Sequence, residues 1–177
     1  MAADNPRSSL ILLEYHTQGK LSTNETRLQA DAYGISPNWT PSLVLNGLLG
    51  ENRMVGPQSP EVYRGRFEAL STRSSPVLIT AKVTSTGFMN ASVELTNLAE
   101  EAIFGGNLYA VVYEETINTA EGHYIVTDIT PAVDVALAGG QTQNFELKSV
   151  EQNSTVRHMV IILKGPDGRI LQALFAK

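Results

Sequence analysis

The chain of 177 residues contains no cysteine, and this absence removes several chemistries at once. Disulfide bridges, zinc–thiolate sites and thiol catalysis all require a cysteine sulfur. The three histidines, His16, His123 and His158, lie far apart and have no histidine neighbour at the spacing of metal ligands. The sequence therefore assigns no catalytic residue, no metal site and no cofactor.

Basic clusters and long apolar runs are also missing. The chain has 13 Lys and Arg against 18 Asp and Glu, a net charge of −5, so we expect no nucleic-acid partner held by phosphate neutralisation. The longest apolar run is far short of the roughly 20 residues of a membrane helix, and we expect no transmembrane segment. Residues 1–9 have no charged stretch followed by an apolar one, which predicts no signal peptide in this chain.

The composition changes near residue 75. Before this point helix-like and strand-like stretches alternate, and after it nearly every stretch has strand character, with Gly, Asn and Pro between. We place a boundary within residues 72–76. The sequence thus predicts two domains, 1–74 and 75–177.

The first helix and the apolar run before it are predicted from local signals. Residues 9–16 (SLILLEYH) form a short apolar run that is typical of a buried parallel strand. Ser22 and Glu25 have the spacing of a capping box, which predicts a helix beginning there. Gly34, directly after Tyr33, is the expected residue beyond its C-terminus.

A hairpin and a second helix are expected next. Residues 42–45 predict a strand, Asn46–Gly47 a turn, and residues 53–55 the hairpin partner. Ser59 followed by Pro60 predicts the start of a helix. Its buried face is expected to carry Tyr63, Phe67 and Leu70.

Residues 75–177 alternate between apolar and polar side chains with a period of two. Gly165–Gly168 has the composition of a hairpin turn. About seven short strands at this spacing predict an antiparallel β-sandwich of the immunoglobulin or fibronectin-III kind. The expected strands are 79–84, 91–96, 108–113, 123–130, 142–147, 157–163 and 169–175.

Two groups of charged residues are weaker candidates for chemistry. Glu14 and His16 would share one face of a strand, where a carboxylate can orient an imidazole as a general base. No nucleophile is placed beside them, so a structural hydrogen bond is favoured. Glu100–Glu101 and Glu114–Glu115 could bind calcium but lack the spaced oxygen ligands of a loop site, which favours solvated turns and strand edges.

The stretch YGI at 33–35 followed by TPSLVLNG at 40–47 resembles the helix, loop, cis-proline, strand and turn of thioredoxin-like proteins. In that superfamily the residue before the proline presents its backbone to an extended peptide. The resemblance implies a cis Thr40–Pro41 bond, which an X–Pro bond permits at roughly 0.5–1 kcal/mol. The alternative is a trans proline that opens a strand. Trp39 would either line a peptide groove or cover the sheet edge.

The resemblance extends into the second part. LYAVVYEE at 108–115, then 123–128 and 159–173, are similar to the immunoglobulin-like half of bacterial envelope proteins of the Omp28-related type. Those proteins pair a thioredoxin-like domain with such a sandwich. The resemblance implies a bacterial envelope or extracellular location. It also implies an α+β fold class, in which a truncated thioredoxin-like α/β unit precedes the antiparallel sandwich.

One departure from that family is large. Its first strand and its Cys-X-X-Cys helix would lie upstream of Ser9, and the missing strand would be central to the sheet. Two strands would then carry unpaired backbone groups, which is costly when they are buried. Three remedies stay open: the chain is a fragment, the two strands pair directly, or a second copy donates a strand in a homo-oligomer.

The sequence predicts a non-catalytic binding or structural module. Its expected partner is an extended peptide or protein, bound at Trp39, Thr40 and Pro41. The alternative is a cysteine-free fragment of a thiol–disulfide oxidoreductase whose catalytic segment lies upstream. A carbohydrate-binding sandwich is a third reading, weakened because Tyr109, Tyr113 and Tyr124 fit a core as readily as a binding surface.

Overall fold

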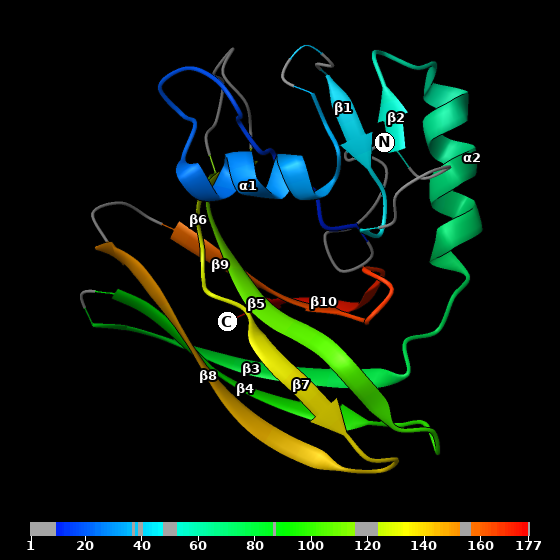
Figure 1. Ribbon diagram of the computed structural model, residues 1–177, viewed down its shortest axis with the longest axis vertical. Helices are drawn as coiled ribbons and strands as arrows, with labels where there is room; N and C mark the ends of the chain where they lie inside the picture. Colours follow the sequence, from blue (N-terminus) through cyan, green and yellow to red (C-terminus); the bar gives the residue numbers. More distant parts are fainter. Residues whose placement is uncertain are drawn as a thin grey trace.

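The structure is a computed structural model that describes residues 10–36, 38, 41–47, 53–86, 88–115, 124–152 and 157–176. Strands dominate these ranges, and the two helices are short (Figure 1). In chain order the elements are α1 (Asn24–Ala32), β1 (Ser42–Val44), β2 (Arg53–Val55), α2 (Pro60–Ser71), β3 (Val77–Thr86), β4 (Phe88–Asn97), β5 (Ile103–Glu115), β6 (Tyr124–Ile129), β7 (Val133–Leu137), β8 (Thr142–Gln152), β9 (Arg157–Lys164) and β10 (Ile170–Ala176).

Two antiparallel sheets pack face to face. The larger has the strand order β10-β9-β5-β6, and β7 also pairs with β5. The smaller has the order β3-β4-β8. A third, two-stranded sheet holds only β1 and β2. The long strand β5 is thus the centre of the five-stranded sheet, as the sequence predicts for residues 108–113.

The core between the two sheets is aliphatic. In β4 the buried and exposed positions alternate, so Ala91, Val93 and Leu95 point inward, as predicted from the period of two. In β5 the inward residues Leu108 and Val112 meet them from the other sheet. Burial of this apolar surface is the main source of stability for such a fold.

The opposite face of the five-stranded sheet is also covered. Val111, Tyr113, Val160 and Ile162 belong to a second buried cluster there, together with Tyr109. Ile11, Leu13 and Tyr15 from the N-terminal segment pack against this cluster. The backbone of Glu14 joins the sheet edge, where its N–H donates to the Tyr124 oxygen at 2.9 Å and its oxygen accepts from Val126 N at 3.0 Å.

The predicted α+β fold class is wrong. The chain is mostly β, and its described residues form no thioredoxin-like α/β unit. The apolar run at 10–16 alternates, so Ile11, Leu13 and Tyr15 cover one face of an existing sheet and do not form a strand buried on both faces. This segment makes a single parallel bridge to Ile125, whereas β1 pairs with β2. Direct pairing between the two expected strands is therefore also wrong.

Both helices form, with differences in detail. The N-cap of α1 is Thr23, and its capping box uses Thr26, so the predicted Ser22–Glu25 box is displaced. Gly34 lies directly beyond the helix with φ +60°, as predicted. The helix α2 begins at Pro60 after Ser59, again as predicted. It buries no residue, however, and its expected apolar face is only half-buried because α2 stands beside the sheets (Figure 1).

The predicted hairpin of β1 and β2 is confirmed. Its turn fits against the connection between β9 and β10, where Ile170 N donates to the Asn46 oxygen at 2.9 Å. Gly47 has φ +71°, and a Cβ there would lie 2.9 Å from the Gly168 oxygen. Only glycine satisfies both the dihedral angle and this close approach.

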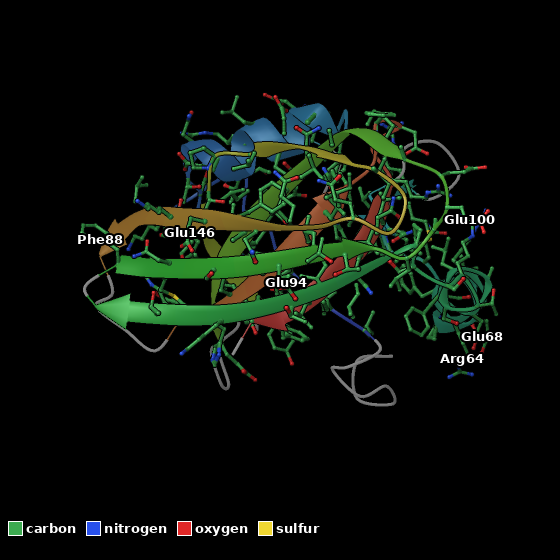
Figure 2. The ribbon with its side chains drawn as sticks, turned by 90° about the horizontal axis from the view of Figure 1, so that it is seen from below. Arg64, Glu68, Phe88, Glu94, Glu100 and Glu146 are labelled. Carbon is green, nitrogen blue, oxygen red and sulfur yellow. The ribbon has the colours of Figure 1, made fainter. Side chains whose placement is uncertain are left out.

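The second part contains every strand expected from the sequence, and β7 in addition. The expected turn at Gly165–Gly168 forms, with Gly168 N donating to the Gly165 oxygen at 3.0 Å. Residues 72–76 connect α2 to β3, and the division into domains 1–74 and 75–177 stays a prediction. The outer face of the three-stranded sheet carries Glu94 and Glu146 (Figure 2), together with the exposed apolar side chains Leu78, Phe88 and Val150.

Candidate ligand-binding site

A cavity of about 430 Å³ lies between α1 and the outer face of the five-stranded sheet. We call it the α1 cavity. Its volume falls within the range of about 300–1,000 Å³ that is usual for small-molecule sites. It is lined by Glu25, Leu28, Gln29, Asn107, Tyr109, Ile129, Thr130, Ala132, Lys164, Gly165, Pro166 and Gly168.

The floor of the α1 cavity comes from two neighbouring strands. Asn107 of β5 and Lys164 of β9 are paired in the antiparallel register. Tyr109 is paired with Ile162, which places it diagonally across from Lys164 on the same face. The side chains of Leu108 and Leu163 point to the opposite face, into the aliphatic core. Because side chains alternate along the two strands, the phenol of Tyr109, the amide of Asn107 and the ammonium of Lys164 lie on the same face of the sheet.

The wall of the α1 cavity is helix α1, and one residue fixes it to the N-terminal segment. The fully buried Thr26 donates its hydroxyl to the His16 carbonyl oxygen at 2.7 Å. The same side chain completes the capping box with Thr23. Glu25 and Gln29 flank Thr26 on the helix surface and line the cavity.

The Lys164 ammonium lies between two aromatic rings. Its Nζ is 4.5 Å from the ring centroid of Tyr33 and 5.4 Å from that of Tyr109. Both distances lie within the limit of about 6 Å for a cation–π interaction. Tyr33 ends α1, and Arg53 Nη1 holds this end by donating to the Gly34 oxygen at 2.9 Å. No described carboxylate forms an ion pair with Lys164.

Two residues that line the α1 cavity each carry a buried polar atom whose hydrogen bonding is incomplete among the described residues. The two atoms are the Tyr109 hydroxyl and Gln29 Nε2. Tyr109 is only 6% exposed, and burial, followed by the neighbouring Tyr33 and Tyr15, raises the pKa of its phenol above the ordinary value. A side-chain hydrogen bond with Tyr33 acts in the same direction, but it falls short of ordinary hydrogen-bond geometry. Gln29 Nε2 has no partner among the described residues. The phenol stays protonated, so it can donate a hydrogen bond. A buried donor that is not fully paired is costly, so both atoms would gain from a ligand that accepts a hydrogen bond.

The residues predicted to bind a peptide are only partly described. Trp39 and Thr40 lie outside the described residues, as does the Thr40–Pro41 bond whose cis form was expected. Pro41 is exposed, and its oxygen accepts a hydrogen bond from Gly56 N at 2.8 Å. Pro41 does not line the α1 cavity. The peptide site at Trp39, Thr40 and Pro41 stays a prediction.

The charged residues singled out in the sequence lie among ordinary structural contacts. Buried His16 Nε2 has no hydrogen-bond partner in the described part of the chain, and the pairing of His16 with Glu14 stays a prediction. Glu114 Oε1 forms an ion pair with Arg157 Nε at 3.1 Å, and Glu115 Oε2 lies 4.0 Å from His158 Nε2. Within the described ranges no three His, Cys, Asp or Glu side chains are grouped as metal ligands. No described helix is long and apolar enough to span a membrane.

The sequence interpretation overlooked Tyr109, Lys164 and Gln29 as site residues. A signal was present in LYAVVY, where Leu108, Ala110 and Val112 alternate with tyrosines and Val111. Such a strand has one aliphatic face and one face with phenols. The docking of α1 over that second face carries no comparable signal, because it depends on contacts distant in sequence.

Comparisons with known proteins identify no family. No family model matches the chain, and no curated protein matches it. Among solved structures it is similar to DesR, a β-glucosidase from Streptomyces venezuelae, at 10% identity and a TM-score of 0.38, over 58% of this chain and 15% of that one. It is also similar to a Bacteroides uniformis β-glucuronidase, at 14% identity and a TM-score of 0.39, over 56% of this chain and 12% of that one.

A third similar structure is the alkylpurine DNA glycosylase AlkC of Pseudomonas fluorescens, at 16% identity and a TM-score of 0.38. The match covers 59% of this chain and 30% of that one. The chain therefore spans less than a third of the length of each of these three proteins. Likeness at this level carries no argument about fold or activity.

Proposed function

We propose that the chain is a non-catalytic binding module and that the α1 cavity is its ligand site. The observation that carries this proposal is a pair of buried donors on residues that line the cavity. The Tyr109 hydroxyl has only a weak hydrogen bond with Tyr33, and Gln29 Nε2 has no partner among the described residues. A ligand that accepts from these donors would remove the cost of their incomplete pairing. The two rings that flank Lys164 hold a cation at the same cavity.

The N-terminal elements support this assignment because they build one side of the cavity. The β1–β2 hairpin anchors the end of α1 through Arg53 and contacts the β9–β10 turn through Gly47. Thr26 fixes the start of α1. In this proposal the helix and the hairpin position the binding site on a sheet that is stable by its own core.

Other expectations from the sequence remain predictions beside this proposal. They are the peptide site at Trp39–Pro41, the resemblance to Omp28-related proteins, the envelope location, the absence of a nucleic-acid partner and a homo-oligomer formed by strand donation. A thiol–disulfide oxidoreductase parent also remains, although a chain without cysteine cannot itself exchange disulfides.

A ligand-observed NMR screen of small neutral and charged fragments tests the proposal. Ala132 is exposed and lines the α1 cavity, so Ala132→Trp should fill the cavity without disturbing the core. Ser92→Trp places the same side chain on the exposed face of the three-stranded sheet and serves as the matched control. We expect fragment binding to the wild type and to Ser92→Trp, and loss of binding in Ala132→Trp. Equal binding to all three proteins would refute the α1 cavity as the site.

A further inference from the structure

The α1 cavity has chemistry for one class of ligand. We propose that it binds a carboxylate carried on a small apolar body, with the carboxylate at Lys164, Tyr109 and Gln29. This inference rests on the proposed function, since it names the ligand of the same site.

The charge of the site favours an anion with a single negative charge. Among the described residues Lys164 is the one basic residue that lines the cavity, and no described carboxylate pairs with it. Glu25 also lines the cavity, and its charge opposes a ligand with two negative charges such as a phosphate monoester. A monocarboxylate satisfies the ammonium with the least repulsion from Glu25.

The hydrogen-bond donors match two carboxylate oxygens. The Tyr109 hydroxyl and Gln29 Nε2 are both buried; the first has only a weak hydrogen bond with Tyr33, and the second lacks an acceptor among the described residues. Together with the Lys164 ammonium they supply three kinds of donor, and a carboxylate has about four acceptor positions on its two oxygens. Hydrogen bonds to an ionised acceptor are roughly twice as strong as neutral ones.

The rest of the lining requires an apolar body. Leu28, Ile129, Ala132 and Pro166 contribute aliphatic surface to the same cavity. Leu28 is 59% exposed, so a ligand would cover an apolar side chain that the protein itself leaves in water. A sugar is a poorer fit, because sugars stack on aromatic faces and Lys164 already occupies a face of Tyr33 and of Tyr109.

Isothermal titration calorimetry with an acid and its amide tests the carboxylate directly. We expect 4-methylpentanoate to bind the wild type about tenfold or more tightly than 4-methylpentanamide, because the amide loses the charge-assisted bonds. Lys164→Met should abolish this preference, and Lys164→Arg should retain it. Lys82→Met removes an exposed lysine of the three-stranded sheet and should leave the preference unchanged.

Two further ligands separate the sources of such a carboxylate. N-acetyl-leucine represents the C-terminus of a peptide, and leucine represents a free amino acid whose ammonium could pair with Glu25. Tighter binding of the first supports a peptide C-terminus, and tighter binding of the second supports a free amino acid. Either result supports a carboxylate site when the corresponding amide binds more weakly.

The failure of this inference differs from the failure of the proposed function. The assignment of a carboxylate ligand is wrong if the acid and the amide bind the wild type equally, or if only neutral fragments bind. The α1 cavity remains the binding site in either case, provided that Ala132→Trp abolishes the binding. If no compound is sensitive to Ala132→Trp, both proposals are wrong. A preference for the acid that persists in Lys164→Met would also overturn the assignment of Lys164.

Discussion

The two faces of the five-stranded sheet differ in chemistry although they come from the same strands. The inner face presents Leu108, Val112 and Ile161 to the three-stranded sheet, and this core is aliphatic. The outer face presents Tyr109 and Tyr113 to α1 and the N-terminal segment. One face is closed by a second sheet, while the other is closed by a nine-residue helix and an extended segment.

The difference separates stability from binding. Two sheets can exclude water over a broad surface, so aliphatic side chains suffice between them. A short helix covers less of the outer face and leaves the α1 cavity beside it. Tyrosines suit this face, because each has an apolar body and a polar tip. The account therefore predicts that inner substitutions affect folding and outer substitutions affect binding.

The largest effect is expected from Ile161→Ala on the inner face. Ile161 is fully buried, so its truncation should cost about 2–5 kcal/mol of unfolding free energy. Leu13→Ala, in the segment that covers the outer face, should cost only about 1 kcal/mol, because Leu13 is half-buried and less of its surface is removed from water. Denaturant unfolding of both variants measures the two values. Equal losses would contradict the distinction between the faces.

The next largest effect is expected where the two sheets are joined by a buried carboxylate. Asp128 of β6 accepts from the Ser149 hydroxyl and from Val150 N at 3.3 Å, both in β8. Ser149→Ala leaves this buried carboxylate with one donor fewer, which should cost about 1–3 kcal/mol. Ser92→Ala, on the exposed face of the three-stranded sheet, should change stability by no more than about 0.5 kcal/mol. Thermal unfolding compares them, and equal shifts would show that the Asp128 link is unimportant.

The sandwich strands were predictable because each carries its own signal. Alternation in residues 91–96 defines which side chains of β4 are buried, and Gly165–Gly168 defines the final hairpin. The position of residues 10–16 was not predictable, because an apolar run does not show whether it forms a strand inside a sheet or packs on the face of one. The wrong fold class follows from that ambiguity. The α1 cavity depends on contacts between α1, β5 and β9, which no local pattern records.

A smaller effect is expected from Thr26→Val in α1. This change removes the hydroxyl that donates to the His16 oxygen and completes the capping box. We expect a loss of about 1–2 kcal/mol, together with faster amide hydrogen exchange in α1. Carboxylate binding should weaken as well, because Gln29 lies on the same helix. Exchange that accelerates equally in β5 would mean that the helix does not open separately.

The smallest effect on stability is expected from Tyr109→Phe. Its buried hydroxyl has only a weak hydrogen bond with Tyr33, so its removal should leave unfolding free energy unchanged or raise it by up to about 1 kcal/mol. Carboxylate affinity should nevertheless fall several-fold to about tenfold. Calorimetry and denaturant unfolding on one preparation give both values. Marked destabilisation with unchanged affinity would reverse the roles assigned to the two faces.

A ¹⁵N-resolved NMR titration with N-acetyl-leucine tests the central claim most directly. Binding at the outer face of the five-stranded sheet predicts the largest shifts at the Gln29 and Asn107 side-chain amides and at the backbone of Gly165 and Gly168. Residues on the exposed face of the three-stranded sheet, such as Glu94, should not shift (Figure 2). Shifts centred on β3, β4 and β8, or none at saturating ligand, would contradict the account.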